Sequence, residues 1–190
     1  PRLTANEVRD GKREGIVVDQ GGKGTMEKNT IFSNAIAGVY IASSGDPVLT
    51  ENIIRNCQVG VCVCDKGRGR MESNQIFEHT QSGVEVLSFG NPFVVGNTIR
   101  GNGGPGVYVH SEGIGVIDGN EVTENTQSGI LVETQGAPRI IKNKLFAGLH
   151  YGAEFASGGL GSMEDNKVYG NNQAGVCITS EADPTVNGNE

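Results

Sequence analysis

Apolar and polar residues alternate along this chain in short stretches, and the stretches recur about every 23 residues. In each unit a glycine is followed by two apolar residues that flank one other residue, as in Val39 and Ile41 or Val84 and Val86. Alternation with a period of two is typical of a half-buried β-strand, because successive side chains of a strand point to opposite faces. The pattern therefore predicts a strand after each recurrent glycine.

Two further apolar positions in each unit keep a fixed distance from a recurrent asparagine. One lies three residues before the asparagine and one lies two residues after it, and each is the centre of another predicted strand. Three short strands with tight corners between them fill the unit, so no helix fits into it. The first position holds Met26, Leu49, Met71, Val94, Ile117, Ile140, Met163 and Val186, and the second holds Val8, Ile31, Ile54, Ile76, Ile99, Val122, Leu145 and Val168.

The asparagine itself recurs in steps of 23 residues, except for one step of 22 between Asn52 and Asn74. Such self-similarity indicates the stacked coils of a solenoid, in which equivalent residues lie above one another about 4.8 Å apart. An amide side chain both donates and accepts hydrogen bonds, and asparagine tolerates the left-handed backbone of a corner. We predict a structural ladder made of Asn29, Asn52, Asn74, Asn97, Asn120, Asn143 and Asn166.

These patterns predict an all-β chain folded as a right-handed parallel β-helix, with about eight coils of about 23 residues and three short strands per coil. The hand follows from the general chirality of parallel crossover connections. We expect residues 1–190 to form a single solenoid that is uncapped at both ends. Within it, the corner before the second strand alternates between glycine pairs and a proline, as in Gly67 and Gly69 followed by Pro92, so the repeating unit is a pair of coils.

A column of arginine and phenylalanine follows the third strand, and we interpret it as structural because it tracks the alternation of the coils. It consists of Arg9, Phe32, Arg55, Phe77 and Arg100.

Composition and charge narrow the possible partners. The chain has 30 glycines, no tryptophan and a formal net charge of -7. The negative charge argues against a nucleic-acid partner or an anionic membrane bound through phosphate contacts. We also expect no cofactor. No apolar run reaches the roughly 20 residues of a membrane-spanning helix. The four cysteines do not occur at positions suited to disulfides or to a metal site, and we interpret them as free thiols in a reducing compartment. They are Cys57, Cys62, Cys64 and Cys177.

Candidate chemistry lies on the outward face of the strand that follows the glycine. A catalytic interpretation would pair Glu133 with Glu154 as acid and base, but an acidic solenoid produces such pairs by chance. The mixture of rings, aliphatic groups and acids is better suited to binding a protein, although a solvated face with nothing bound fits equally well. The candidate protein-binding residues are Tyr40, Glu85, Leu87, Tyr108, His110, Leu131 and Glu133, with no catalytic and no metal-binding residue among them.

The coil pattern resembles the β-helix repeat of carbohydrate-binding proteins and sugar hydrolases. Segments such as Gly69–Phe77 and Asp46–Asn52 also resemble the β-helix region of the F-box-only proteins, in particular the pair numbered ten and eleven, the former more than the latter. That resemblance implies the substrate-recruiting module of a cullin-RING (SCF) ubiquitin ligase, in which a separate F-box binds Skp1 and the cullin. No F-box-like helical segment occurs in this sequence.

The sequence thus leads to three hypotheses. The first is a non-catalytic recognition solenoid that captures a protein substrate of a ubiquitin ligase in the cytoplasm or the nucleus. The alternative is a carbohydrate-binding or carbohydrate-cleaving β-helix enzyme, and the third is a structural spacer. We therefore expect a chain that is not itself an enzyme.

Overall fold

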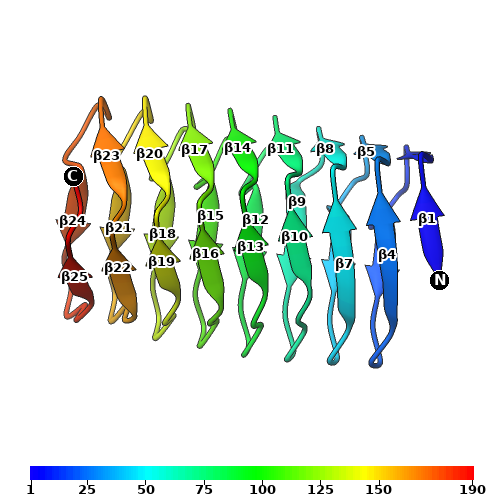
Figure 1. Ribbon diagram of the computed structural model, residues 1–190, viewed down its shortest axis with the longest axis horizontal. Coiled ribbons are helices and arrows are strands. Elements are labelled where there is room, and N and C mark those ends of the chain that lie inside the picture. Colours follow the sequence, from blue (N-terminus) through cyan, green and yellow to red (C-terminus); the bar gives the residue numbers. More distant parts are fainter.

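The computed structural model describes all 190 residues and contains 25 strands and no helix (Figure 1). The strands form three parallel sheets, which we call A, B and C, and each coil contributes one strand to each sheet. The coils are stacked in sequence order, so the two chain ends lie at opposite ends of the stack (Figure 1). With no helix present, the chain has none that could cross a membrane.

Nine strands form sheet A, and eight form each of sheets B and C. Sheet A contains β1 (Arg2–Thr4), β4 (Lys23–Glu27), β7 (Asp46–Thr50), β10 (Arg70–Glu72), β13 (Phe93–Val95), β16 (Val116–Asp118), β19 (Arg139–Ile141), β22 (Ser162–Glu164) and β25 (Thr185–Asn187). Sheet B contains β2 (Glu7–Arg9), β5 (Thr30–Phe32), β8 (Ile53–Arg55), β11 (Gln75–Phe77), β14 (Thr98–Arg100), β17 (Glu121–Thr123), β20 (Lys144–Phe146) and β23 (Lys167–Tyr169). Sheet C contains β3 (Ile16–Val18), β6 (Ala37–Ile41), β9 (Val59–Val63), β12 (Val84–Val86), β15 (Val107–Val109), β18 (Ile130–Val132), β21 (Ala153–Phe155) and β24 (Val176–Ile178).

The register confirms that equivalent residues lie above one another. Val84 of β12 pairs with Val107 of β15, 23 residues further on, while Val39 of β6 pairs with Val61 of β9, only 22 residues further on. The shorter step follows β8, because Ile31 and Ile54 are still 23 residues apart. The shortened coil keeps every column aligned, since the missing residue falls in a corner.

The core is one continuous column of aliphatic side chains. A cluster of 26 buried residues runs along the axis, and the inner strands contribute one residue each in sheets A and B and two each in sheet C. Burying a side chain of this size contributes about 1.5–3 kcal/mol. A single coil buries little by itself, so stability depends on contact with the neighbouring coils.

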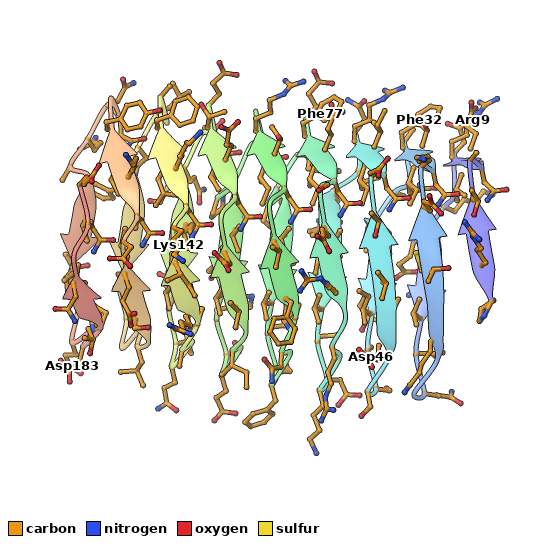
Figure 2. The ribbon with its side chains drawn as sticks, viewed as in Figure 1. Arg9, Phe32, Asp46, Phe77, Lys142 and Asp183 are labelled. Atoms are coloured by element: carbon orange, nitrogen blue, oxygen red, sulfur yellow. The ribbon has the colours of Figure 1, made fainter.

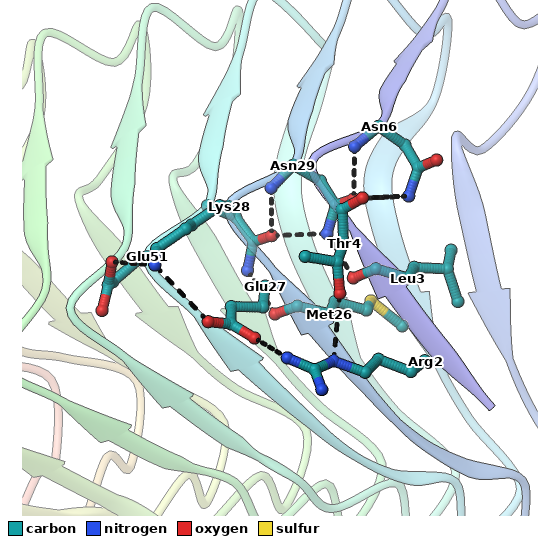
Figure 3. A network of polar contacts seen from close by, with 10 residues as sticks. Arg2, Leu3, Thr4, Asn6, Met26, Glu27, Lys28, Asn29 and Glu51 are labelled. Carbon is teal, nitrogen blue, oxygen red and sulfur yellow. Dashed lines mark hydrogen bonds and ion pairs between the residues drawn. The ribbon is translucent and has the colours of Figure 1, made fainter.

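The predicted asparagine ladder is confirmed. The side-chain oxygen of Asn74 accepts hydrogen bonds from both the backbone N–H and the side-chain amide of Asn52, each at 2.9 Å. The Asn52 amide also donates to the carbonyl of Met26 at 2.9 Å. Asn6 and Asn29 repeat the arrangement at the first coils (Figure 3). The ladder thus satisfies one buried corner in every coil.

The backbone conformation at these corners differs from the prediction in one respect. The left-handed residue is the one before each asparagine, as in Lys28 (φ 55°) and Glu51 (φ 55°), and the asparagine itself is not left-handed. The asparagine is therefore required for its hydrogen bonds and not for its backbone. The recurrent glycine of sheet C is required for space: a Cβ on Gly38 would lie 2.6 Å from Cγ2 of Ile54 and 2.8 Å from the Gly60 carbonyl.

Candidate functional site

The outward face of sheet C carries a group of side chains that contact one another across three consecutive coils. Tyr108 of β15 and His110, which directly follows β15, have ring centroids 4.2 Å apart and planes 24° from parallel. They face outward because the strand alternates, with Val107 and Val109 buried in the core.

Carboxylates from the coils on either side complete the group. His110 Nε2 lies 3.1 Å from Oε1 of Glu85 in β12, and Tyr108 donates its hydroxyl proton to Oε2 of Glu133, which follows β18, at 2.8 Å. The other ring nitrogen of His110 lies 2.9 Å from the hydroxyl of Ser111. We call Glu85, Tyr108, His110 and Glu133 the Tyr-His cluster. Each of its members has a polar partner, which fixes the orientation of both rings.

The cluster is half-buried, and this determines the protonation state of its tyrosine. The side chains of His110 and Glu85 are 16% and 22% exposed. Burial, followed by the hydrogen bond to Glu133, raises the pKa of Tyr108 well above its ordinary value of 10.0. Tyr108 therefore stays protonated well above neutral pH and can act as a proton donor.

Two polar grooves flank the cluster. One, of about 330 Å³, lies over the corner before the sheet C strands and includes Glu85 and Tyr108 in its wall. The other, of about 840 Å³, follows the corner after these strands and includes Ser111. Hydroxyl and amide side chains line both grooves, and such groups hydrogen-bond to the hydroxyls of a polar ligand. Their lining also includes Gln81, Ser82, Gln127, Thr134, Gln135, Ser157 and Ser180.

Glu154, which the catalytic interpretation pairs with Glu133, forms a separate contact. It accepts a hydrogen bond from the hydroxyl of Ser128 at 2.5 Å, and Nδ1 of His150 lies 3.8 Å away. Glu133 is instead bound to Tyr108. His150 also lies 3.3 Å from Ser128, a contact that the sequence did not predict.

The cysteines are free, as predicted. The thiol of Cys64 donates to the hydroxyl oxygen of Tyr40 at 3.0 Å, and this contact is the main cause of the raised pKa of Tyr40. Burial raises the pKa of Cys62, so its reactive thiolate form is disfavoured at neutral pH. No group of three or more histidine, cysteine, aspartate or glutamate side chains lies close enough to hold a metal ion.

The sequence-based candidates therefore separate into groups. Glu85, Tyr108, His110 and Glu133 meet in the Tyr-His cluster. Leu131 is the register partner of Tyr108 on β18, and Leu87 follows β12 one coil before His110, but neither contributes a polar group. Tyr40, on β6, lies three coils before Tyr108 with its own partner Cys64. Ser111 and Ser128 are not among the sequence-based candidates. The only signal for them in the sequence is that each lies close to the outward residues of sheet C.

The three-sheet coil, the aliphatic core and the asparagine ladder define the class of the protein as a parallel β-helix. The family described as "Right handed beta helix region" matches residues 1–145 and, in a second alignment, residues 58–190. The chain belongs to this family, which confirms the predicted fold and its hand.

Solved structures share the same architecture. The A-modules of the mannuronan C-5 epimerases AlgE6 and AlgE4 from Azotobacter vinelandii superpose with a TM-score of 0.74 each, at 20% and 16% sequence identity. The matches cover 99% and 100% of this chain, which spans 57% of the length of each epimerase module. No curated protein matches the sequence. At this level of identity the likeness establishes the fold.

The comparisons correct one prediction and leave another unsupported. The expectation of a chain that is not an enzyme is wrong on this finding, because the two solved structures described above are modules of mannuronan C-5 epimerases, which are enzymes. The resemblance to the F-box-only proteins rested on a few residues of each coil, and such residues are shared by stacked β-helices in general because they form the core and the corners. The β-helix repeat is confirmed, whereas the F-box-only identity is not shown.

Proposed function

We propose that the chain is the β-helix module of an enzyme that modifies a polysaccharide. The outer face of sheet C would hold the polymer, and the Tyr-His cluster would move a proton at one of its sugar rings. A single observation carries this proposal: a tyrosine, a histidine and two carboxylates from three consecutive coils form one connected network between two polar grooves. The structural likeness to mannuronan C-5 epimerases supports the choice of substrate class.

The members of the cluster have different roles in this proposal. His110 accepts a proton, and Glu85 orients its ring and stabilises the imidazolium that forms. Tyr108, with its raised pKa, returns a proton or stabilises negative charge that develops on the sugar. Because the two rings are stacked at 4.2 Å, both groups can reach the same sugar residue.

The geometry favours proton transfer at carbon over hydrolysis. Hydrolysis of a glycosidic bond needs two carboxyl groups that face the bond, about 5–9.5 Å apart. In the cluster, Glu85 and Glu133 are each engaged by a ring that lies between them. A uronate sugar offers a more suitable site, since its carboxylate acidifies the hydrogen on the adjacent ring carbon. We therefore propose that His110 removes this hydrogen as a proton on a uronate polymer. Either a proton then returns to the same carbon, which is epimerisation, or the bond to the glycosidic oxygen on the neighbouring carbon breaks and that oxygen takes a proton from Tyr108, which is elimination.

The test is incubation of the chain in deuterium oxide with polymannuronate, polygalacturonate and neutral mannan. Nuclear magnetic resonance would record deuterium entering at the ring carbon next to the carboxylate, and ultraviolet absorbance would record an unsaturated product. Separate substitutions His110→Gln and Tyr108→Phe should each lower the rate by about 100-fold or more. Tyr169→Phe, at an exposed tyrosine on sheet B, is the matched control and should leave the rate unchanged.

Two outcomes would contradict the proposal. One is the absence of deuterium exchange, elimination and cleavage on every polymer by a folded chain. The other is exchange that survives both substitutions in the Tyr-His cluster.

The recruitment of a protein substrate to a ubiquitin ligase, in the cytoplasm or the nucleus, remains a second candidate that draws only on the sequence resemblance. It predicts capture of a protein by the face with Tyr40, Tyr108 and Leu131 and no effect of any polysaccharide on that capture. Equal capture by the triple alanine variant would contradict it.

A further inference from the structure

The outer face of sheet B differs in charge from the face that carries the Tyr-His cluster. The outward positions of sheet C hold no lysine or arginine, whereas the outward positions of sheet B hold five cations and only two carboxylates, Glu7 and Glu121. This excess occurs in a chain whose net charge is -7. The cations are Arg9, Arg55, Arg100, Lys144 and Lys167.

Phenylalanine rings separate these arginines along one column, as the alignment of Arg9, Phe32 and Phe77 along one edge of the stack shows (Figure 2). The guanidinium carbon of Arg55 lies 4.4 Å from the ring centroid of Phe32, and that of Arg100 lies 4.5 Å from the centroid of Phe77. Each ring thus has at least one guanidinium group over it, and the rings hold the arginine side chains in place. Each planar guanidinium group keeps N–H donors for a ligand.

Only two of the five cations lack a carboxylate partner. Arg9 pairs with Glu7 and Asp10, Lys144 pairs with Glu121, and Lys167 pairs with Glu190. These pairs neutralise the cations at both ends of the face.

Arg55 and Arg100 form no ion pair, so their charges are uncompensated. Arg55 donates to the side-chain oxygen of Asn56 at 2.6 Å. Glu78, which follows Phe77 on the coil between the two arginines, instead accepts a hydrogen bond from Asn56 at 3.4 Å.

The spacing of Arg55 and Arg100 suits a linear polymer with regularly placed charges. They are register partners of the same residue, Phe77, on either side, so they lie two coils or about 9.6 Å apart. That distance is of the order of the length of a disaccharide. The guanidinium group of arginine binds a carboxylate through two parallel hydrogen bonds. Two such groups at this spacing would contact the charged groups of alternate sugars.

We propose that Arg55 and Arg100 form a docking surface for an acidic polysaccharide. The choice of a polysaccharide rests on the proposed function, but the surface is separate from the Tyr-His cluster. It would supply the affinity for an anionic polymer that the sheet C face, without any lysine or arginine, does not provide. A polymer anchored here is held at high local concentration near the neighbouring face.

A single-stranded nucleic acid fits this surface less well. Its bases stack on exposed aromatic faces. On sheet B, a guanidinium group already lies over the ring of Phe32 and another over the ring of Phe77, and Phe146 and Tyr169 are stacked on each other at 5.1 Å. Charge complementarity therefore remains, but the stacking platforms are absent.

The experiment measures the affinity of the chain for polymannuronate by affinity gel electrophoresis at low salt, with neutral mannan and single-stranded DNA for comparison. The double variant Arg55→Gln/Arg100→Gln should bind polymannuronate about tenfold more weakly than the unmodified chain. The control Arg70→Gln/Arg139→Gln makes the same change in net charge on sheet A and should bind within a factor of about two, because it alters only screened surface charge. Glu78→Gln should bind more tightly, since it removes the carboxylate between the two arginines.

A further variant distinguishes a direct loss of binding from a loss caused by misfolding. Arg55→Lys/Arg100→Lys keeps the charge on the rings but removes the fork, and it should show a loss intermediate between the unmodified chain and the glutamine variant. Equal losses in the sheet A control and the sheet B variant would overturn the proposal. Affinity for DNA or mannan as high as for polymannuronate would also overturn it.

The result is independent of the fate of the proposed reaction. His110→Gln should lower the rate of proton exchange by about 100-fold or more, while it weakens the affinity for polymannuronate less than the sheet B variant does. If no reaction is found but the sheet B variant loses affinity, the docking surface stands and the proposed enzyme activity fails. If the reaction is found and the sheet B variant binds normally, the docking surface fails and the proposed activity stands.

Discussion

At the scale of single residues, His79 shows how a column in which asparagine recurs accommodates a titratable ring. It occupies the position held by Cys57 in the preceding coil and by Asn102 in the following coil, and it is 2% exposed. The Cys57 N–H donates to its Nδ1 at 3.2 Å, and its Nε2 lies 3.2 Å from the carbonyl of Ile54. These contacts require the neutral ring with its proton on Nε2, so His79 replaces an asparagine as one donor and one acceptor.

Acid should destabilise the fold through this histidine. Burial lowers the pKa of His79 from 6.5 to about 4. The folded state therefore takes up this proton only at lower pH than the unfolded state does. The stability that the neutral ring provides is complete above pH 6.5 and is lost as the pH falls toward about 4, by about 3 kcal/mol. Urea unfolding at pH 7 and pH 4.5 measures this loss.

The matched control is His79→Asn, which introduces the residue type of Asn102 in the following coil. The variant should show a smaller loss of stability between pH 7 and pH 4.5 than the unmodified chain, since the remaining carboxylates are common to both. Identical pH profiles for the two proteins would contradict the assignment.

At the scale of the strand and its corner, the alternation of glycine and proline links each coil to the next. Gly69 has φ +114°, and a Cβ there would lie 2.8 Å from the carbonyl oxygen of Pro47 in the preceding coil. A residue with a side chain is therefore excluded by its backbone conformation and by its neighbour at once. The repeating unit is a pair of coils because a proline coil needs a glycine coil after it.

Gly69→Ala should therefore lower the free energy of unfolding more than the same substitution at a left-handed glycine without a close neighbour. Gly96 has φ +60° and nothing within 4 Å of the position of a Cβ, so Gly96→Ala should cost only the backbone penalty of about 1–2 kcal/mol. Gly69→Ala should lower the free energy of unfolding by about 1–2 kcal/mol more, because the new methyl group must also displace the Pro47 carbonyl. Guanidinium unfolding of both variants provides the comparison, and equal losses would show that the contact with Pro47 is unimportant.

At the scale of the whole molecule, the solenoid is a stack of similar coils in which proline coils and glycine coils alternate. Stability in such a stack is approximately additive over repeats and their interfaces. Nothing in the core marks a particular coil, since the aliphatic cluster runs through the stack without interruption. The molecule should therefore tolerate the removal of coils when the alternation is preserved.

We predict that the deletion of two coils destabilises the protein less than the deletion of one coil. Removing residues 69–114, a pair of coils, places Gly115 after the Pro47 coil and preserves the alternation. Removing residues 69–91, a single coil, places Pro92 directly after the Pro47 coil. The single-coil deletion should have the lower midpoint of thermal unfolding by circular dichroism, although it shortens the stack less. A lower midpoint for the two-coil deletion would mean that length outweighs the alternation.

The sequence alone determined the architecture because every structural requirement of a stacked coil repeats. The inward positions represented by Ile31 and Val84, the asparagine ladder and the crowded Gly38 each recur at a fixed interval, so the pattern could be read without coordinates. The proposed function was less accessible. The sequence placed Tyr108 and His110 on one face but pointed to a chain without catalysis, which the structural comparisons contradict.

Only the tertiary structure decided which outward side chains meet. Glu85 and His110 are 25 residues apart, and whether a carboxylate turns toward the ring on the next coil depends on rotamers that a repeat does not specify. The same holds for Arg55 and Arg100, whose freedom from ion pairs follows from Glu78 turning to Asn56. Periodicity fixes the backbone and the core because each coil repeats the same contacts, whereas the outer faces are made of residues that differ from coil to coil.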